Sequence, residues 1–103
     1  VIDWQYVGDM GDMFKAVLLS PKKDACTYQT RGELRPVKDA VSIVGRLVPG
    51  VKLNPLPGEL DLPWKFDSSL FEKEIGYYPT TTLEEGLIKS INMVRERHGL
   101  KLL

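Results

Sequence analysis

The spacing of hydrophobic positions changes along the chain, and the changes divide it into elements. Residues 1–7 alternate β-branched and aromatic side chains with polar ones, which predicts a β-strand with two unlike faces. From Asp9 onward the apolar positions recur three and four residues apart, as on one face of an amphipathic helix. These positions are Met10, Met13, Phe14, Val17 and Leu18. Asp9 stands where a carboxylate caps the first turn, and Ser20-Pro21 ends the helix.

The middle of the chain predicts a strand, a helix and a second strand. Residues 25–30 form the first strand, and residues 31–33 break it. Helical spacing follows, with Pro36 at the first helical position and Pro49-Gly50 as the stop. The apolar positions of this helix are Val37, Ala40, Val41, Val44, Leu47 and Val48. Residues 51–53 form the second strand, and two strands joined through a helix are expected to run parallel with a right-handed crossover.

Residues 55–66 form an unusually apolar loop. Three prolines and one glycine exclude both helical and strand spacing. Leaving Trp64 and Phe66 in water would forfeit roughly 1.5 to 3 kcal/mol for each side chain. We therefore expect the loop to lie against the protein body or to line a pocket.

A short helix is predicted to begin at Asp67 or Ser69. Ser69 and Glu72 have the spacing of a capping box, and Gly76 stands just beyond the expected end.

The C-terminal residues predict a longer helix. Thr82 and Glu85 form a second capping box, and the helix extends to Gly99. Its apolar face contains Leu83, Leu87, Ile88, Ile91, Val94 and His98. The whole pattern predicts one α/β domain, with about four helices and a few short, partly parallel strands.

Composition limits the binding partners and the cellular compartment that are expected for this protein. The chain has 103 residues with 14 basic and 14 acidic side chains, and this balance argues against nucleic acid and against an anionic membrane surface. No apolar run approaches the roughly 18 residues needed to cross a bilayer. The single Cys26 cannot form an internal disulfide, so a cytoplasmic protein is expected. Val1 begins the chain inside a predicted strand, which suggests a fragment or a processed chain.

The residues offer little for catalysis. His98 stands at a helix end, where a structural role is expected, and Ser68-Ser69 has no neighbouring base. No His or Cys pair has the spacing of a metal site. Gly8 and Gly11 are two glycines where a dinucleotide fingerprint needs three, and acidic residues stand at the anion position. We therefore predict no catalytic, cofactor-binding or metal-binding residue.

Several short segments resemble those of one enzyme family. Residues 3–9, Asp-Trp-Gln-Tyr-Val-Gly-Asp, resemble the Asp-Trp-x-Tyr-Val-x-Asp segment of the extended short-chain dehydrogenases, the NAD-dependent nucleotide-sugar epimerase and dehydratase family. Four later segments follow in the family's order and spacing, over nearly all of the chain. They are Pro57-Gly58-Glu59, Asp67-Ser68-Ser69, Glu74-Ile75-Gly76-Tyr77-Tyr78-Pro79 and Leu83-Glu84-Glu85-Gly86-Leu87.

The resemblance implies that residues 1–103 are the C-terminal substrate-binding lobe of a Rossmann-type oxidoreductase. The family's glycine-rich segment and its Tyr-x-x-x-Lys pair belong to an N-terminal Rossmann half that this sequence does not include. The parent enzyme is then expected to bind NAD or NADP, and the lobe alone to be inactive and to hold no cofactor. A lobe without its other half is also expected to expose an apolar face, which favours a homo-oligomer.

The resemblance also implies three substrate-binding residues. Glu59 stands where family members place an aspartate that can bond a ribose hydroxyl, and Trp64 and Phe66 would close that pocket. The alternative for all three is packing of the loop onto the lobe.

Two departures from the family leave the substrate open. Ile2 and Leu56 occupy positions where nucleotide-sugar epimerases commonly carry arginines that hold the diphosphate, although Arg31, Arg35 or Lys52 would be substitutes. One alternative is a small hydroxy substrate, as in the threonine-dehydrogenase branch of the superfamily. Another is a free-standing ligand-binding or protein-interaction domain without catalytic activity.

Overall fold

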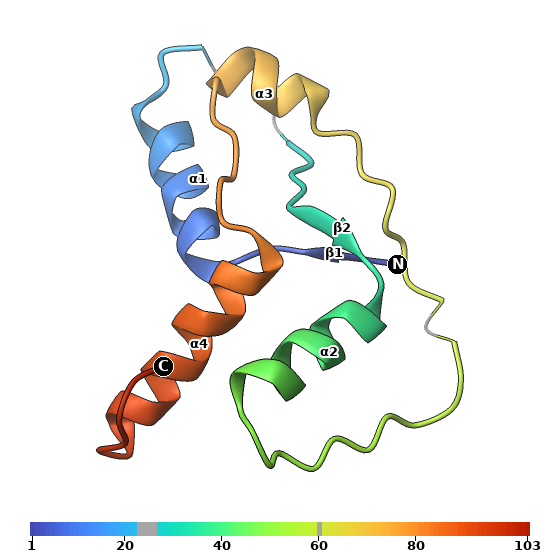
Figure 1. Ribbon diagram of the computed structural model, residues 1–103. Coiled ribbons are helices and arrows are strands. Elements are labelled where there is room, and N and C mark those ends of the chain that lie inside the picture. Colours follow the sequence, from blue (N-terminus) through green and yellow to red (C-terminus); the bar gives the residue numbers. More distant parts are fainter. Residues whose placement is uncertain (23–26, 60) are drawn as a thin grey trace.

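The computed structural model describes residues 1–22, 27–59 and 61–103. Its helices and strands are β1 (Ile2–Trp4), α1 (Val7–Leu19), β2 (Glu33–Arg35), α2 (Val37–Leu47), α3 (Ser69–Ile75) and α4 (Leu83–Arg97). A short sheet lies at the centre, with α1 and α3 toward one end of the molecule and α2 and α4 toward the other (Figure 1). The prediction of four helices is confirmed.

The two strands pair antiparallel, so the prediction of a parallel strand–helix–strand unit is wrong. Residue pairs across the sheet are Ile2 with Arg35, Asp3 with Leu34 and Trp4 with Glu33. Residues 27–30 and 51–53 are not strands, and β2 lies where a break was predicted. Residues 25 and 26 of the predicted strand, with Cys26, lie outside the described residues.

Hydrogen bonds between side chains and the backbone hold the sheet in this register. The amide of Gly32 donates to Asp3 Oδ1 at 2.7 Å, and the indole nitrogen of Trp4 donates to the carbonyl of Arg35 at 3.0 Å. A Cβ atom on Gly32 would lie 1.9 Å from the carbonyl oxygen of Trp4. Only glycine therefore lets the chain come close enough to β1 to pair with it.

The helix boundaries agree with the sequence pattern better than the caps do. At α4 the predicted capping box is confirmed, since Thr82 accepts from the Glu85 amide and Glu85 accepts from the Thr82 amide. Asp9 is not a cap: it lies inside the first turn of α1 and is buried. The reason is a stronger set of partners, because the amide and hydroxyl of Thr81 donate to Asp9 at 3.0 and 2.7 Å.

At α3 the helix begins at Ser69 and ends before Gly76, as predicted, but the predicted capping box is absent. Gly76 takes a left-handed conformation with φ +74° just after the helix, as expected for a C-terminal glycine. Ser69 and Glu72 form no capping box. Instead Ser68 is the N-cap residue, and its hydroxyl donates to the Glu72 carboxylate at 2.7 Å.

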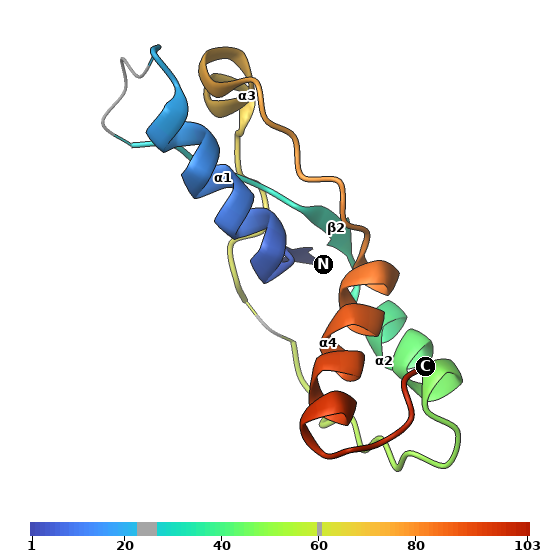
Figure 2. The same ribbon diagram turned by 90° about the vertical axis from the view of Figure 1, so that its left-hand side faces the viewer.

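The core is small and the molecule is thin. The buried apolar side chains are Met13, Ala40, Ile43, Phe71 and Leu83. Ala40, Ile43 and Leu83 form one cluster where α2 meets α4. The radius of gyration is 16.4 Å, against about 13 Å for a typical domain of this length. The molecule measures 49 × 35 × 16 Å, and its thinness is visible in Figure 2.

The apolar loop lines cavities, which was one of the two predicted alternatives, and it lies outside the core. Residues 51–59 are exposed, and Leu56 is 85% exposed. Trp64 and Phe66 are half-buried. The loop extends from the end of α2 around one side of the molecule to α3 (Figure 1). Its prolines prevent regular pairing with the sheet, so it lies over the surface without joining the core.

Candidate functional site

A cavity of about 880 Å³ lies between the N-terminal strand, the start of α2 and the apolar loop. Its lining residues are Val1, Ile2, Pro36, Val37, Lys38, Leu56, Pro57, Gly58 and Glu59. The N-terminus and the loop lie side by side at this edge of the molecule (Figure 1). Ile2, Leu56 and Glu59, which the resemblance places around the substrate, therefore share one cavity. We call it the edge cavity.

Two charged side chains line the edge cavity, and both are available to a ligand. Lys38 and Glu59 are exposed. Neither side chain forms a hydrogen bond or an ion pair with another residue in the described ranges. The cavity therefore offers one ammonium group and one carboxylate among aliphatic walls.

Arg35 cannot replace the missing phosphate-binding arginines. Its Nε donates to Asp39 at 2.7 Å, and its Nη1 donates to Glu33 at 2.9 Å. These bonds, first that to Asp39 and then that to Glu33, raise the pKa of the Arg35 guanidinium above its ordinary value. With two carboxylates already bound, this side chain has no spare charge for a diphosphate.

Lys38 is the cation that sequence reasoning missed. Arg31 and Lys52, the other proposed substitutes, do not line the edge cavity. Lys38 is the second residue of α2, and the antiparallel pairing of β1 with β2 brings the start of α2 beside Ile2. Because the predicted topology was parallel, no pattern along the chain indicated that these residues would meet.

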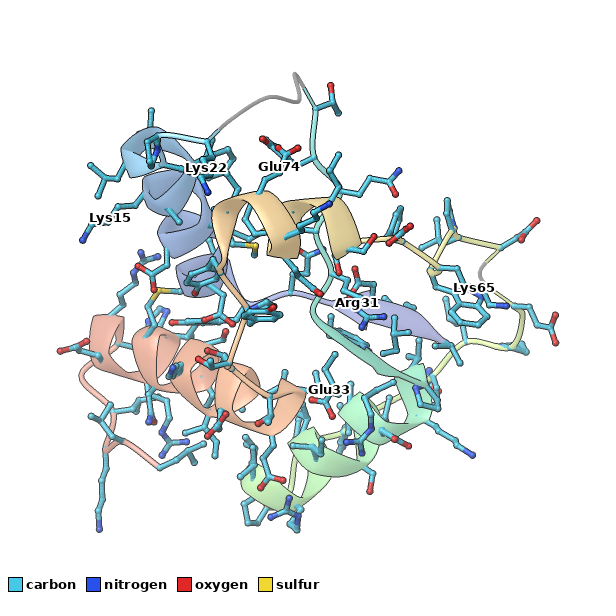
Figure 3. The ribbon with its side chains drawn as sticks, turned by 90° about the horizontal axis from the view of Figure 1, so that it is seen from above. Lys15, Lys22, Arg31, Glu33, Lys65 and Glu74 are labelled. Atoms are coloured by element: carbon cyan, nitrogen blue, oxygen red, sulfur yellow. The ribbon has the colours of Figure 1, made fainter. Side chains whose placement is uncertain are left out.

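Trp64 and Glu59 line separate cavities. Trp64 belongs to a cavity of about 560 Å³ that is lined by residues 61–65 of the loop. The Lys65 ammonium lies 5.0 Å from the centre of the Trp64 ring, within the range of a cation–π contact. Lys65 lies out on the loop, away from the helices (Figure 3). Phe66 lines neither cavity.

A third cavity, of about 300 Å³, lies between the end of β1 and the start of α4, but its polar groups are already used. The Thr81 hydroxyl donates to Asp9, and the Thr82 hydroxyl is part of the α4 capping box. The Ser90 hydroxyl donates to the Gly86 carbonyl at 2.8 Å. These bonds serve the fold, so this cavity has less to offer a polar ligand than the edge cavity has.

The described residues contain no group of three or more His, Cys, Asp or Glu side chains placed to hold a metal ion. His98 is the C-cap residue of α4 and is exposed. In the same part of the chain, no helix has the length and apolar character needed to cross a membrane.

Gly8 and Gly11 do not form the turn of a dinucleotide-binding site. Both lie within α1 itself, whereas a phosphate-binding turn needs glycines between a strand and a helix. The acidic Asp9 between them is buried against Thr81. No step of cofactor chemistry is therefore assigned to residues of this chain.

Comparison of the chain with protein-family models, with curated proteins and with solved structures finds no match in any of the three.

Proposed function

We propose that this chain is the substrate-binding lobe of an NAD(P)-dependent oxidoreductase similar to the nucleotide-sugar epimerases and dehydratases. One observation carries the proposal: Ile2, at the start of the chain, lines the same cavity as Leu56 and Glu59 of the loop. The resemblance assigns these positions to substrate contact from sequence motifs alone. Their convergence on one cavity supports that assignment.

The chain's own contribution is to bind and orient the substrate. The Glu59 carboxylate accepts hydrogen bonds from substrate hydroxyl groups, and the Lys38 ammonium pairs with a substrate acid group. The aliphatic side chains of Ile2 and Leu56 shield the remaining, less polar part of the bound substrate from water. Hydride transfer, with NAD or NADP, belongs to the N-terminal Rossmann half of the parent enzyme.

The lining of the edge cavity also favours a second candidate, a small hydroxy acid in place of a nucleotide diphosphate-sugar. A diphosphate is normally held by several charge-assisted hydrogen bonds, each contributing roughly 1.5 to 3 kcal/mol. The edge cavity offers the single ammonium of Lys38, and Arg35 is held by carboxylates. One cation matches one carboxylate better than it matches two phosphates.

A thermal-shift series tests both candidates. Uridine diphosphate and small hydroxy acids would be added to the chain over a range of concentrations. We expect the hydroxy acids to raise the melting temperature by several degrees at saturation, and uridine diphosphate to act weakly. Lys38→Met and Glu59→Gln should abolish the shift, whereas Lys65→Met should leave it unchanged. A strong shift by uridine diphosphate would identify the first candidate as correct, and shifts insensitive to Lys38 and Glu59 would contradict the site.

A further inference from the structure

One wall of the edge cavity is held in place by the sheet and by the start of α2. This wall, the fixed wall, consists of Ile2, Pro36, Val37 and Lys38. Ile2 pairs with Arg35 across the sheet, and Arg35 leads directly into Pro36, the N-cap residue of α2. The Nε atom of Arg35 also donates to Asp39, in the first turn of the helix, at 2.7 Å. The fixed wall therefore belongs to the bonded part of the molecule.

The opposite wall belongs to the loop and is not bonded to the body. It consists of Leu56, Pro57, Gly58 and Glu59. Within the described ranges, residues 52–59 form no hydrogen bond and no ion pair with the rest of the chain. Leu53 lies beside Gly45 of α2 but is still 41% exposed, and Leu56 is 85% exposed. Weak apolar contact is therefore what holds this wall where it is.

The backbone of the loop wall combines stiff and free positions. Pro55 and Pro57 fix their own φ angles and restrict the residue before each of them. Gly50 and Gly58 have φ angles of +83° and +132°, and a Cβ atom on either would meet nothing within 4 Å. Glycine enters and leaves such angles without steric cost. We call residues 51–59 the flap, a stiff segment with a glycine hinge before it and another near its end.

We propose that the flap moves between this open position and a closed one against the fixed wall, and that a ligand in the edge cavity favours the closed position. This inference rests on the proposed function and names a motion that regulates the same site. A ligand shifts such an equilibrium only if it binds one position better than the other. The two charged groups of the cavity meet this condition, because Lys38 lies on the fixed wall and Glu59 on the flap. A hydroxy acid contacts both walls when its carboxylate pairs with Lys38 and its hydroxyl donates to Glu59.

The size of the edge cavity gives a second reason for closure. Its volume of about 880 Å³ lies near the top of the range of roughly 300 to 1,000 Å³ that holds drug-sized molecules. A hydroxy acid with about seven non-hydrogen atoms would leave most of this space to water. Closure would expel that water and bring the exposed Leu56 side chain toward Ile2 and Val37. The closed position therefore suits a small ligand better than the open one does.

Measurements on the free chain test the motion without any ligand. We expect ¹⁵N relaxation dispersion to detect exchange between microseconds and milliseconds at the amides of Leu53, Leu56 and Glu59, and none at the amides of α2. Gly58→Ala should suppress this exchange, because a side chain is strained at φ +132°. Gly99→Ala is the matched control, since Gly99 also has a positive φ, +63°, and open space around it but follows α4. This control should leave the exchange unchanged, and flap amides without exchange would overturn the proposal.

Addition of 2-hydroxybutyrate tests the link between the motion and the ligand. At saturation, nuclear Overhauser effects between the methyl groups of Leu56 and Val37 should strengthen. Gly58→Ala should raise the dissociation constant at least fivefold, whereas Gly99→Ala should change it less than twofold. Binding that shifts the Lys38 amide but leaves the methyl contacts unchanged would overturn the flap and leave the proposed function intact. Exchange in the free chain without any binding of the acid would support the flap and contradict the small-acid candidate.

Discussion

Asp9 shows how one residue connects distant parts of this molecule. Its buried carboxylate accepts two hydrogen bonds from Thr81, 72 positions later in the chain, and so joins α1 to the segment that leads into α4. Sequence reasoning assigned the same carboxylate to a helix cap because only local partners are visible there. A hydrogen-bond partner so far along the chain cannot be predicted from the spacing of neighbouring residues.

Replacement of Asp9 should therefore be costly. Asp9→Ala would leave the partly buried amide and hydroxyl of Thr81 without an acceptor, and we expect a loss of about 2 kcal/mol in the free energy of unfolding. Glu96→Ala, an exposed carboxylate on α4, should change it by less than about 0.5 kcal/mol. Urea unfolding of the two variants measures the difference. Equal stability of both would contradict the structural role of Asp9.

Glu33 gives the fold a dependence on pH. Its pKa is lowered from the ordinary value, first by the Leu83 amide that donates to it at 2.6 Å and then by Arg35. The side chain points into the region between α2 and α4 (Figure 3). Because the folded pKa is the lower one, the charged carboxylate stabilises the fold above the ordinary pKa. That stabilisation is lost as the pH falls through the folded value.

Comparison with Glu33→Gln isolates this effect from those of other carboxylates. The original chain should be more stable than the variant by about 1 kcal/mol above roughly pH 5, and the difference should shrink as the pH falls below the ordinary pKa of a glutamate and through the lowered pKa of Glu33. Unfolding in urea at a series of pH values measures it. A difference that stays constant across the series would show that the charge of Glu33 does not contribute.

At the scale of elements, the helices and the first strand were predictable, whereas the second strand and the antiparallel pairing were not. α1, α2 and α4 carry apolar spacing over 11 to 15 residues, which is a strong local signal. The second strand, β2, has three residues, too few to establish alternation. The pairing depends instead on Asp3, Trp4 and Gly32, whose bonds to the backbone form only after the chain has folded back on itself.

Gly32 is the position where this sheet is most sensitive. Gly32→Ala would place a methyl group against the Trp4 carbonyl, so we expect a loss of more than about 2 kcal/mol in stability. Gly45→Ala is the matched control, because its Cβ would lie 3.7 Å from Leu53, an ordinary contact. As Gly45 is within α2, alanine there should stabilise the chain by about 0.5 to 1 kcal/mol. Thermal unfolding of both variants distinguishes the two effects, and equal melting temperatures would contradict the close approach.

At the scale of the whole molecule, two features stand out, a thin body and a cavity at its edge. Much apolar surface stays exposed, including Val7 and Phe14 on α1, and this surface is available for contacts with other molecules. The edge cavity was predictable in part. The sequence motifs pointed to Ile2, Leu56 and Glu59. Lys38 lies at the cavity only because β1 and β2 pair antiparallel, and this pairing depends on contacts between distant residues.

The edge cavity is proposed to bind the substrate through Lys38 and Glu59, and its single cation favours a small hydroxy acid over a nucleotide diphosphate. Titration of the ¹⁵N-labelled chain with such an acid, followed by two-dimensional NMR, tests it most directly. We predict saturable chemical-shift changes concentrated at the amides of Ile2, Lys38 and Glu59. These changes should disappear in the Lys38→Met variant. Shifts that are absent, or that concentrate on residues away from the edge cavity, would contradict it.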